Sequence, residues 1–272
     1  MKIIAVTNRK GGVGKTTVAT HIAAGLATLG QKVGLIDTDS QGHAALSIGM
    51  PKENGLYALM VDELPIEKVV RYVPPEKYST AERPATGQLW LVPSSHQTYK
   101  IPHVMEEGGE LLFLQQMEDF ATWASLDTII IDTNPSLSKL DGAIWLATDG
   151  FVYVTETNGL SFDGVSEAVQ QMARFSKLRQ RQLHRDTRVL GIVPNKFRAG
   201  TKLHRNNIAD LAAGFRGLVW TPIPLSVKWE EAVNDVNHRQ TMYTYLPMSG
   251  EAAAAWELVE MAGKAINTWA AV

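Results

Sequence analysis

Short apolar runs alternate along this chain with longer segments in which apolar residues recur every three or four positions. The short runs are typical of buried strands and the longer segments of amphipathic helices. The predicted strands cover residues 2–7, 32–37, 88–93, 128–132, 150–155 and 188–193, with a shorter one near 219–223. The predicted helices cover about 15–29, 109–125, 138–147, 161–183, 203–214 and 249–269. This alternation predicts an α/β fold in which a mostly parallel, twisted sheet carries helices on both faces.

The stretch from about residue 51 to residue 87 interrupts this alternation. Prolines at positions 65, 74, 75 and 84 break it up. We expect a short helix over 55–61, a second over 66–72, and then a mobile loop over 74–87. The stretch is interpreted as an irregular insertion within one domain that spans 1–272.

The composition fits one large domain, because 45% of the 272 residues are apolar. No apolar run approaches the roughly 18 residues that a transmembrane helix needs, and the first strand begins too early to leave room for a signal peptide. The chain has no cysteine, which excludes disulfides, cysteine-ligated zinc and cysteine-held iron–sulfur clusters. These features predict a cytoplasmic protein.

Basic residues are concentrated in one segment, although the formal net charge of the chain is only −2. Between positions 174 and 205 the single acidic residue is Asp186. Such segregation indicates either a face that binds a polyanion or a solvated helix surface, and charge alone leaves both open. The basic residues of this segment are Arg174, Lys177, Arg179, Arg181, Arg185, Arg188, Lys196, Arg198, Lys202 and Arg205.

A glycine-rich run near the start of the chain carries the strongest chemical signal. It lies between the first predicted strand and the first predicted helix, the context that a phosphate-binding P-loop requires. Its backbone N–H groups and the helix N-terminus can hold an anion, Lys15 can reach the outer phosphates, and Thr16 can place its hydroxyl on Mg²⁺. A glycine-rich turn without a ligand is the less favoured alternative. The run is Lys10, Gly11, Gly12, Val13, Gly14, Lys15, Thr16 and Thr17.

Acidic residues follow two further predicted strands. Asp37 ends the strand over 32–37 and Asp39 follows it two residues later. Asp132 ends the apolar strand over 128–132 in the Walker B pattern. In a parallel sheet the carboxyl ends of neighbouring strands meet at one crevice. We therefore expect a metal-and-water site here, rather than carboxylates in solvent-exposed turns.

Together these motifs resemble those of the ParA/MinD family of deviant Walker A P-loop ATPases. The resemblance is carried by KGGVGKTT at 10–17, LIDTDSQGH at 35–43 and IIIDTNPS at 129–136. Weaker matches follow over 162–164, 194–197, 222–224 and 249–252. The resemblance covers nearly the whole chain and implies the P-loop NTPase fold and a slow, Mg²⁺-dependent ATPase.

The resemblance also implies roles for individual residues. Lys10, the family's signature lysine, would reach across a dimer interface to the partner's nucleotide, and Gly11 would stay small so that the two loops can face one another. The catalytic residues would be Lys10, Lys15 and Asp39, and Asp39 would position the attacking water. Thr16, Asp37 and Asp132 would hold Mg²⁺ and its water shell. ATP would contact Gly11, Gly12, Val13, Gly14, Lys15, Thr16 and Thr17, and on its adenine side Asn195 and Pro224.

Several positions depart from the family pattern. Ser40 stands in place of a proline and His43 in place of an asparagine in the segment after the second strand, and Asn134 replaces a proline after Asp132. Leu225 stands where many relatives have an arginine, which puts one common DNA or nucleotide contact in doubt.

Members of the family differ in what the ATP-bound dimer holds. The end of this chain, 257–272, contains one lysine, which disfavours the amphipathic membrane anchor of the division-site group. Without an N-terminal helix-turn-helix extension, the chain is most similar to the short, Soj-like partition ATPases. Trp256 and Trp269 are expected to pack on the sheet.

The resemblance therefore implies an ATP-dependent homodimer that binds nonspecific DNA, associates with the nucleoid and is stimulated by a ParB-like protein. The expected DNA contacts are Arg198, Lys202, Arg205 and Lys228, with Arg179, Arg181 and Arg185 as an extension of the patch or a solvated helix end. The alternatives are a MinD-like or cargo-positioning ATPase that acts on a membrane or protein scaffold, and a biosynthetic ATP-dependent enzyme.

Overall fold

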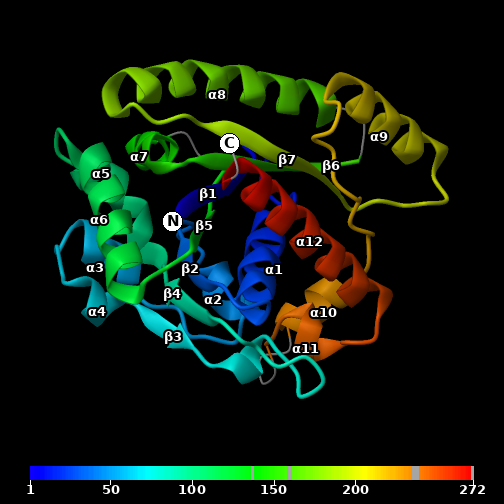
Figure 1. Ribbon diagram of the computed structural model, residues 1–272, viewed down its shortest axis with the longest axis horizontal. Helices are drawn as coiled ribbons and strands as arrows, with labels where there is room; N and C mark the ends of the chain where they lie inside the picture. The colour runs from blue at the N-terminus through cyan, green and yellow to red at the C-terminus, as the bar shows by residue number, and fades with distance from the viewer. Residues whose placement is uncertain (136–137, 158–160, 235–238, 271–272) are drawn as a thin grey trace.

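A computed structural model describes residues 1–272 except 136–137, 158–160, 235–238 and 271–272 (Figure 1). Its sheet has seven strands in the order β3-β4-β2-β5-β1-β6-β7. All neighbours are parallel except β3 and β4. The strands are β1 (Lys2–Thr7), β2 (Lys32–Asp37), β3 (Arg71–Val73), β4 (Gln88–Val92), β5 (Thr128–Asp132), β6 (Gly150–Glu156) and β7 (Arg188–Asn195).

Helices cover both faces of this sheet, which confirms the predicted α/β architecture (Figure 1). The α-helices are α1 (Lys15–Thr28), α2 (His43–Ser47), α3 (Gly55–Met60), α4 (Ile66–Val69), α5 (Ile101–Val104), α6 (Gly109–Ala124), α7 (Lys139–Ala147), α8 (Ser161–Leu183), α9 (Lys202–Gly214), α10 (Lys228–Asn234), α11 (Met242–Tyr245) and α12 (Gly250–Ala270). Two short 3₁₀ helices are η1 (Pro75–Lys77) and η2 (His96–Lys100).

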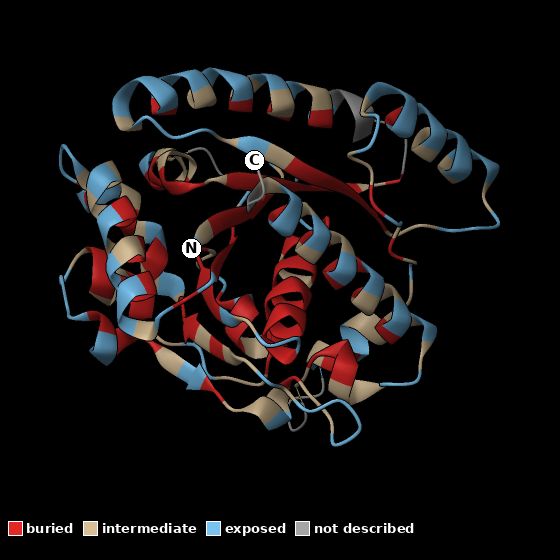
Figure 2. Ribbon diagram, viewed as in Figure 1, coloured by how far each residue is buried: buried red, intermediate tan, exposed pale blue. Residues whose placement is uncertain are grey.

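The central strands are buried on both faces, which is why they are continuous apolar runs in the sequence (Figure 2). Along β1, Ile4 and Val6 join the core beneath α1 and α12, while Ile3 and Ala5 join the core beneath α6, α7 and α8. The strand β1 lies between β5 and β6, so the loop that follows it opens at the middle of the sheet's carboxyl edge.

Two of the predicted elements are wrong. The helix expected over 66–72 ends at Val69, and Arg71–Val73 pairs with β4 instead, where the Tyr72 ring contacts the Trp90 ring edge-on. The strand expected near 219–223 forms only isolated bridges to β7 at Val219 and to Phe197 at Pro224. Pro222 and Pro224 lack the N–H groups that a continuous ladder needs.

The segment expected to be a mobile loop, 74–87, packs against the Walker A helix α1 and the C-terminal helix α12. Gly87 donates its backbone N–H to the carbonyl of Ala27 at 2.9 Å, and Tyr78 is fully buried. The Arg83 guanidinium lies 3.6 Å from the centre of the Trp256 ring. Trp256 itself stacks on Tyr243, and Trp269 lies beside Lys2, so both tryptophans of α12 pack at the border of the core.

Candidate nucleotide site

The loop between β1 and α1 has the backbone that a phosphate-binding loop needs. Gly12 and Gly14 have positive φ angles of 73° and 96°, and Gly14 caps the N-terminus of α1. A Cβ added at Gly14 would lie 2.1 Å from Nδ2 of Asn195, so both conformation and space require glycine there. The first turn of α1 contains no acidic residue, which leaves its positive end available to an anion.

Lys15 is buried inside this loop. Its ammonium group donates to the carbonyl of Lys10 at 3.2 Å. Burial lowers the pKa of Lys15, and the negative charges of Asp132 and Asp39 oppose that effect. Lys15 therefore lies where the loop and both acids meet, as its predicted phosphate contact requires.

The two acids predicted to hold Mg²⁺ are adjacent. Asp37 and Asp132 are Cα partners in the parallel pair β2–β5, and both are fully buried. Asp37 accepts the backbone N–H groups of Asp39 and Ala44, each at 3.0 Å. Burial raises the pKa of Asp37 to about 7. Burial, and after it the charge of Asp37, raises the pKa of Asp132 well above its usual value. The neighbouring Thr16 and the charge of Lys15 act to lower this pKa, but they do not outweigh burial.

The environment of Asp132 fits a hydrated magnesium ion. Neither of its buried carboxylate oxygens accepts a hydrogen bond from the described residues. A buried, unpartnered carboxylate is costly unless a cation or water completes it. Within the described part of the chain, no three histidine or acidic side chains converge to form a metal cage. That arrangement suits Mg²⁺, which takes many of its ligands from phosphates and water.

Asp39 lies on the loop after β2, close to both buried acids. Its Oδ1 accepts the backbone N–H of Gln41 at 2.9 Å, and its carbonyl accepts the Gly42 N–H at 2.9 Å. Its charge contributes to the raised pKa values of Asp37 and Asp132. Its assignment as the residue that positions water stays a prediction.

Lys10 does not point into its own loop. Its ammonium lies 2.5 Å from Oε2 of Glu156, and the other oxygen of that carboxylate is 2.8 Å from Nζ of Lys196. The Lys10 side chain is 61% exposed. The ammonium is therefore paired with a carboxylate of its own subunit, but it lies at the surface, where a second molecule can reach it.

The segments predicted to hold adenine lie side by side. Ile223 donates its N–H to the carbonyl of Pro194, and Phe197 donates to that of Ile223, each at 2.9 Å. The Asn195 amide, however, is used within the chain: Nδ2 donates to the Val13 carbonyl at 2.7 Å and Oδ1 accepts the Lys196 N–H at 2.8 Å. Pro224 is half-buried beside Phe197. Contacts of Asn195 and Pro224 with adenine stay predictions.

Comparison with known proteins agrees with this site. A family model described as an AAA domain matches residues 1–185. The sporulation initiation inhibitor protein Soj of Bacillus subtilis is 30% identical over 95% of this chain and 97% of its own length. The chromosome-partitioning ATPase Soj of Thermus thermophilus is 32% identical over 94% of this chain and 93% of its own length. The chain belongs to the ParA/MinD family. It is a P-loop ATPase.

Two solved structures of similar fold are an ATP complex and a plasmid partition protein. An ATP complex of a McdA variant from Cyanothece superposes with a TM-score of 0.77 and 17% identity, covering 98% of this chain and 96% of that one. A plasmid partition protein of Borrelia burgdorferi superposes with a TM-score of 0.70 and 18% identity, covering 97% of this chain and 98% of that one. At these identities the likeness establishes the fold alone, and it confirms the P-loop NTPase architecture of this ParA/MinD-family ATPase.

The basic residues predicted to bind DNA fall into two groups. Arg198, Lys202 and Arg205 are exposed around the start of α9. Lys228, at the start of α10, is half-buried and pairs with Glu251 at 3.2 Å. The structure thus places three of the four on one open surface and engages the fourth in an ion pair.

Arg179 does not extend this surface. Its side chain is 1% exposed, and its guanidinium lies 2.5 Å from Asp149 and donates to the carbonyls of Leu146 and Asp186. It fastens α8 to the segments that flank β6. Arg185 pairs with Glu118 at 2.6 Å, which leaves Arg181 as an exposed member of the group. The charge run therefore combines structural and surface residues that sequence alone does not separate.

Two residues of the site were missed by sequence reasoning. Glu156 lies in an ordinary Thr-Glu-Thr sequence, and its contact with Lys10 joins residues that are 146 positions apart. His21 is buried on α1, where Nε2 accepts the Met242 N–H at 2.9 Å and Nδ1 lies 2.7 Å from the Thr17 carbonyl. The sequence gives no signal of this bridge, because it joins residues that are 221 positions apart.

Proposed function

We propose that this ATPase forms a homodimer around two ATP molecules, binds DNA without sequence preference in that state, and is released by hydrolysis that a ParB-like partner stimulates. The observation that carries the proposal is the position of Lys10, exposed at the mouth of the P-loop with its ammonium outside its own phosphate site. A second subunit that faces this loop would bring such a lysine to the other subunit's nucleotide.

In that arrangement each of the two active sites takes groups from both subunits. Lys15 and the N-terminus of α1 bind the phosphates, and Thr16, Asp37 and Asp132 orient the magnesium ligands. Mg²⁺, when bound, neutralises charge on the phosphate oxygens. Asp39 orients the attacking water, and Lys10 of the facing subunit stabilises the charge that develops on the transferred phosphoryl group.

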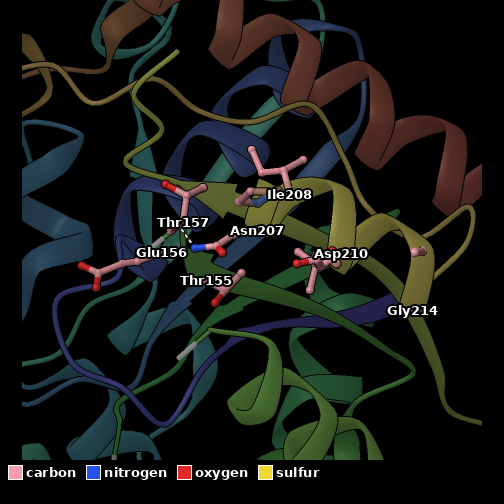
Figure 3. A pocket seen from close by; sticks show the side chains of 10 residues that line it. Thr155, Glu156, Thr157, Asn207, Ile208, Asp210 and Gly214 are labelled. Atoms are coloured by element: carbon pink, nitrogen blue, oxygen red, sulfur yellow. Dashed lines mark hydrogen bonds between the residues drawn. The ribbon is translucent and has the colours of Figure 1, made fainter. Parts of the chain in front are cut away.

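The exposed cluster Arg198, Lys202 and Arg205 supports DNA as the partner of the dimer. Phosphate contacts from such side chains need no base recognition and give salt-dependent binding. The same segment is joined to the end of β6: His204 Nδ1 lies 2.6 Å from Oγ1 of Thr157, and Asn207 donates to the Thr157 carbonyl at 2.9 Å. Figure 3 shows Asn207 of α9 beside Thr157, the residue that follows Glu156. Because Lys10 contacts Glu156, the contacts of Lys10 and of α9 fall on adjacent residues.

The membrane alternative is less well supported. The apolar side of α12, including Leu258, Val259 and Ala262, is buried in the core beneath α1. No helix in the described ranges has the length and apolarity to span a bilayer. A protein scaffold in place of DNA stays open to the experiment below.

The test is binding of purified protein to unrelated DNA duplexes with ATP, with ADP and without nucleotide, each at several salt concentrations. Tight binding with ATP alone that weakens steeply with salt is expected. Equal binding in all nucleotide states, or none in any, contradicts the proposal, and liposome co-sedimentation then tests the membrane alternative.

A further inference from the structure

We infer that Glu156 is a positioning residue that holds the signature lysine, Lys10, within its own subunit until a second subunit is engaged. The inference rests on the proposed role of Lys10 across a dimer interface. It adds a step to that role, because Lys10 must leave Glu156 before it can reach another subunit's nucleotide.

Each oxygen of the Glu156 carboxylate has its own lysine. Oε2 is 2.5 Å from Nζ of Lys10, and Oε1 is 2.8 Å from Nζ of Lys196. The Glu156 side chain is 11% exposed, whereas those of Lys10 and Lys196 are 61% and 42% exposed. In Figure 3 its carboxyl end points away from Asn207 and Asp210 of α9. The carboxylate is thus a fixed, mostly buried anion on which two surface lysines converge.

The position of Glu156 follows from the sheet register. Thr7 at the end of β1 pairs with Tyr153 in β6, so the last residues of β6 run alongside the start of the P-loop. Asn8 donates its side-chain amide to the Val154 carbonyl at 2.6 Å and accepts the backbone N–H of Lys10 at 2.8 Å. The backbone and the side chain of Lys10 are therefore both oriented toward β6.

The carboxylate stays charged at neutral pH. Burial acts to raise the pKa of Glu156, but hydrogen bonds from Lys10 and Lys196 outweigh it and lower the pKa to about 2. When Lys10 leaves, Lys196 remains to neutralise the same carboxylate. The second lysine thus avoids an unpaired buried anion, whose cost would otherwise oppose release.

Two substitutions on this contact should change dimerisation in opposite directions. In E156Q the anion is lost and Lys10 is free, so dimers with the non-hydrolysable analogue AMPPNP should form at a several-fold lower protein concentration. In K196Q the carboxylate loses one of its two lysines and should hold Lys10 more tightly, so dimers should need several-fold more protein. A general loss of fold integrity would weaken both variants, which separates it from the inferred role. E118Q, which removes the surface pair with Arg185, is the matched control and should leave dimerisation unchanged.

A second readout does not depend on dimers. The rate at which a dilute amine-acylating reagent labels Lys10 in the nucleotide-free protein, measured by mass spectrometry, should rise several-fold in E156Q and stay unchanged in E118Q. Equal labelling of Lys10 in wild type and E156Q overturns the inference, as does AMPPNP-dependent dimerisation at the same concentration in both. Absence of AMPPNP-dependent dimers in every variant refutes the proposed function instead, while the labelling rates still decide whether Glu156 holds Lys10.

Discussion

Asp37 and Asp132 face each other as register partners at the ends of β2 and β5, fully buried and with raised pKa values. Two neighbouring carboxylates in a buried position destabilise the protein unless a proton or a cation compensates them. The nucleotide site therefore carries an electrostatic strain that a bound magnesium ion and its water shell would relieve.

Replacing Asp132 by Asn should stabilise the nucleotide-free protein and at the same time lower its ATPase activity. The nucleotide-free variant should be more stable than wild type, by roughly 1–2 kcal/mol at pH 7.5, because one of two adjacent buried carboxyl groups is replaced by a neutral amide. Mg²⁺-dependent ATPase activity should fall by about 100-fold or more. Thermal denaturation without nucleotide and steady-state hydrolysis measure the two effects. A nucleotide-free variant less stable than wild type contradicts the assignment of Asp132 as an uncompensated carboxylate.

The glycines of the P-loop should respond differently to substitution. Gly14→Ala should cost roughly 2 kcal/mol of stability and abolish nucleotide binding, because the residue has a positive φ and its Cβ would meet the Asn195 amide. Calorimetric titration with ADP and chemical denaturation check both effects. ADP affinity equal to that of wild type would show that the loop can rearrange around the added methyl group.

Gly11→Val is the contrasting case. Among the residues that the structure describes, Pro135 alone lies within 4 Å of a Cβ added at Gly11, at 3.9 Å, so this part of the subunit has room for a side chain. ADP binding by the monomer should therefore persist, whereas AMPPNP-dependent dimerisation should be lost if two such loops face one another. Sedimentation velocity with each nucleotide measures this. Normal dimers in the variant would place the interface away from the P-loop.

His21 gives the protein a pH dependence of known sign. Burial lowers its pKa to about 4, below the value of 6.5 expected in the unfolded chain, so the unfolded state binds more protons between these values. Stability from the neutral imidazole is complete above pH 6.5 and is lost as the pH falls. The stability advantage of wild type over His21→Gln should shrink by about 2 kcal/mol between pH 7 and pH 5. Denaturant titrations of both proteins across this range cancel the contributions of the other titratable groups, which the two proteins share. A constant difference would mean that the pKa of His21 is the same in the folded and the unfolded protein, and would contradict its burial as a neutral imidazole.

The basic surface at α9 should act through DNA phosphates. Lys202→Gln combined with Arg205→Gln should weaken ATP-dependent DNA binding and reduce the slope of log affinity against log salt by about 2, because two phosphate contacts are lost. ATPase activity without DNA should be retained. Lys264→Gln, an exposed lysine on α12, is the control. An unchanged salt slope in the double variant would place the DNA elsewhere.

The parts of this protein that the sequence predicted are those whose signal is local. The strands β1, β2 and β5 have the predicted bounds, since each is an apolar run ended by a turn and buried on both faces. The P-loop and its acids follow from motifs in which spacing and chemistry are tied together. Neither prediction depends on contacts between residues that are far apart in the sequence.

The parts that escaped prediction depend on long-range contacts. Arg179 has the sequence context of a solvated helix end, but it is buried because Asp149 and several carbonyls satisfy its guanidinium. Arg71–Val73 forms a strand because β4 offers a free edge, not because of its own pattern. The pairing of Lys10 with Glu156 likewise requires that β6 lie beside β1.

The most direct test of the account is complementation between two inactive variants, Lys10→Ala and Asp39→Ala. If Lys10 acts across the dimer interface, a mixed dimer contains one complete site, built from Asp39 of the first variant and Lys10 of the second. An equimolar mixture should then recover at most roughly a quarter of the wild-type ATPase rate, because half of the symmetric dimers are mixed and each has one working site. A mixture as inactive as its components, although mixed dimers form, would show that Lys10 serves its own nucleotide and would contradict the account.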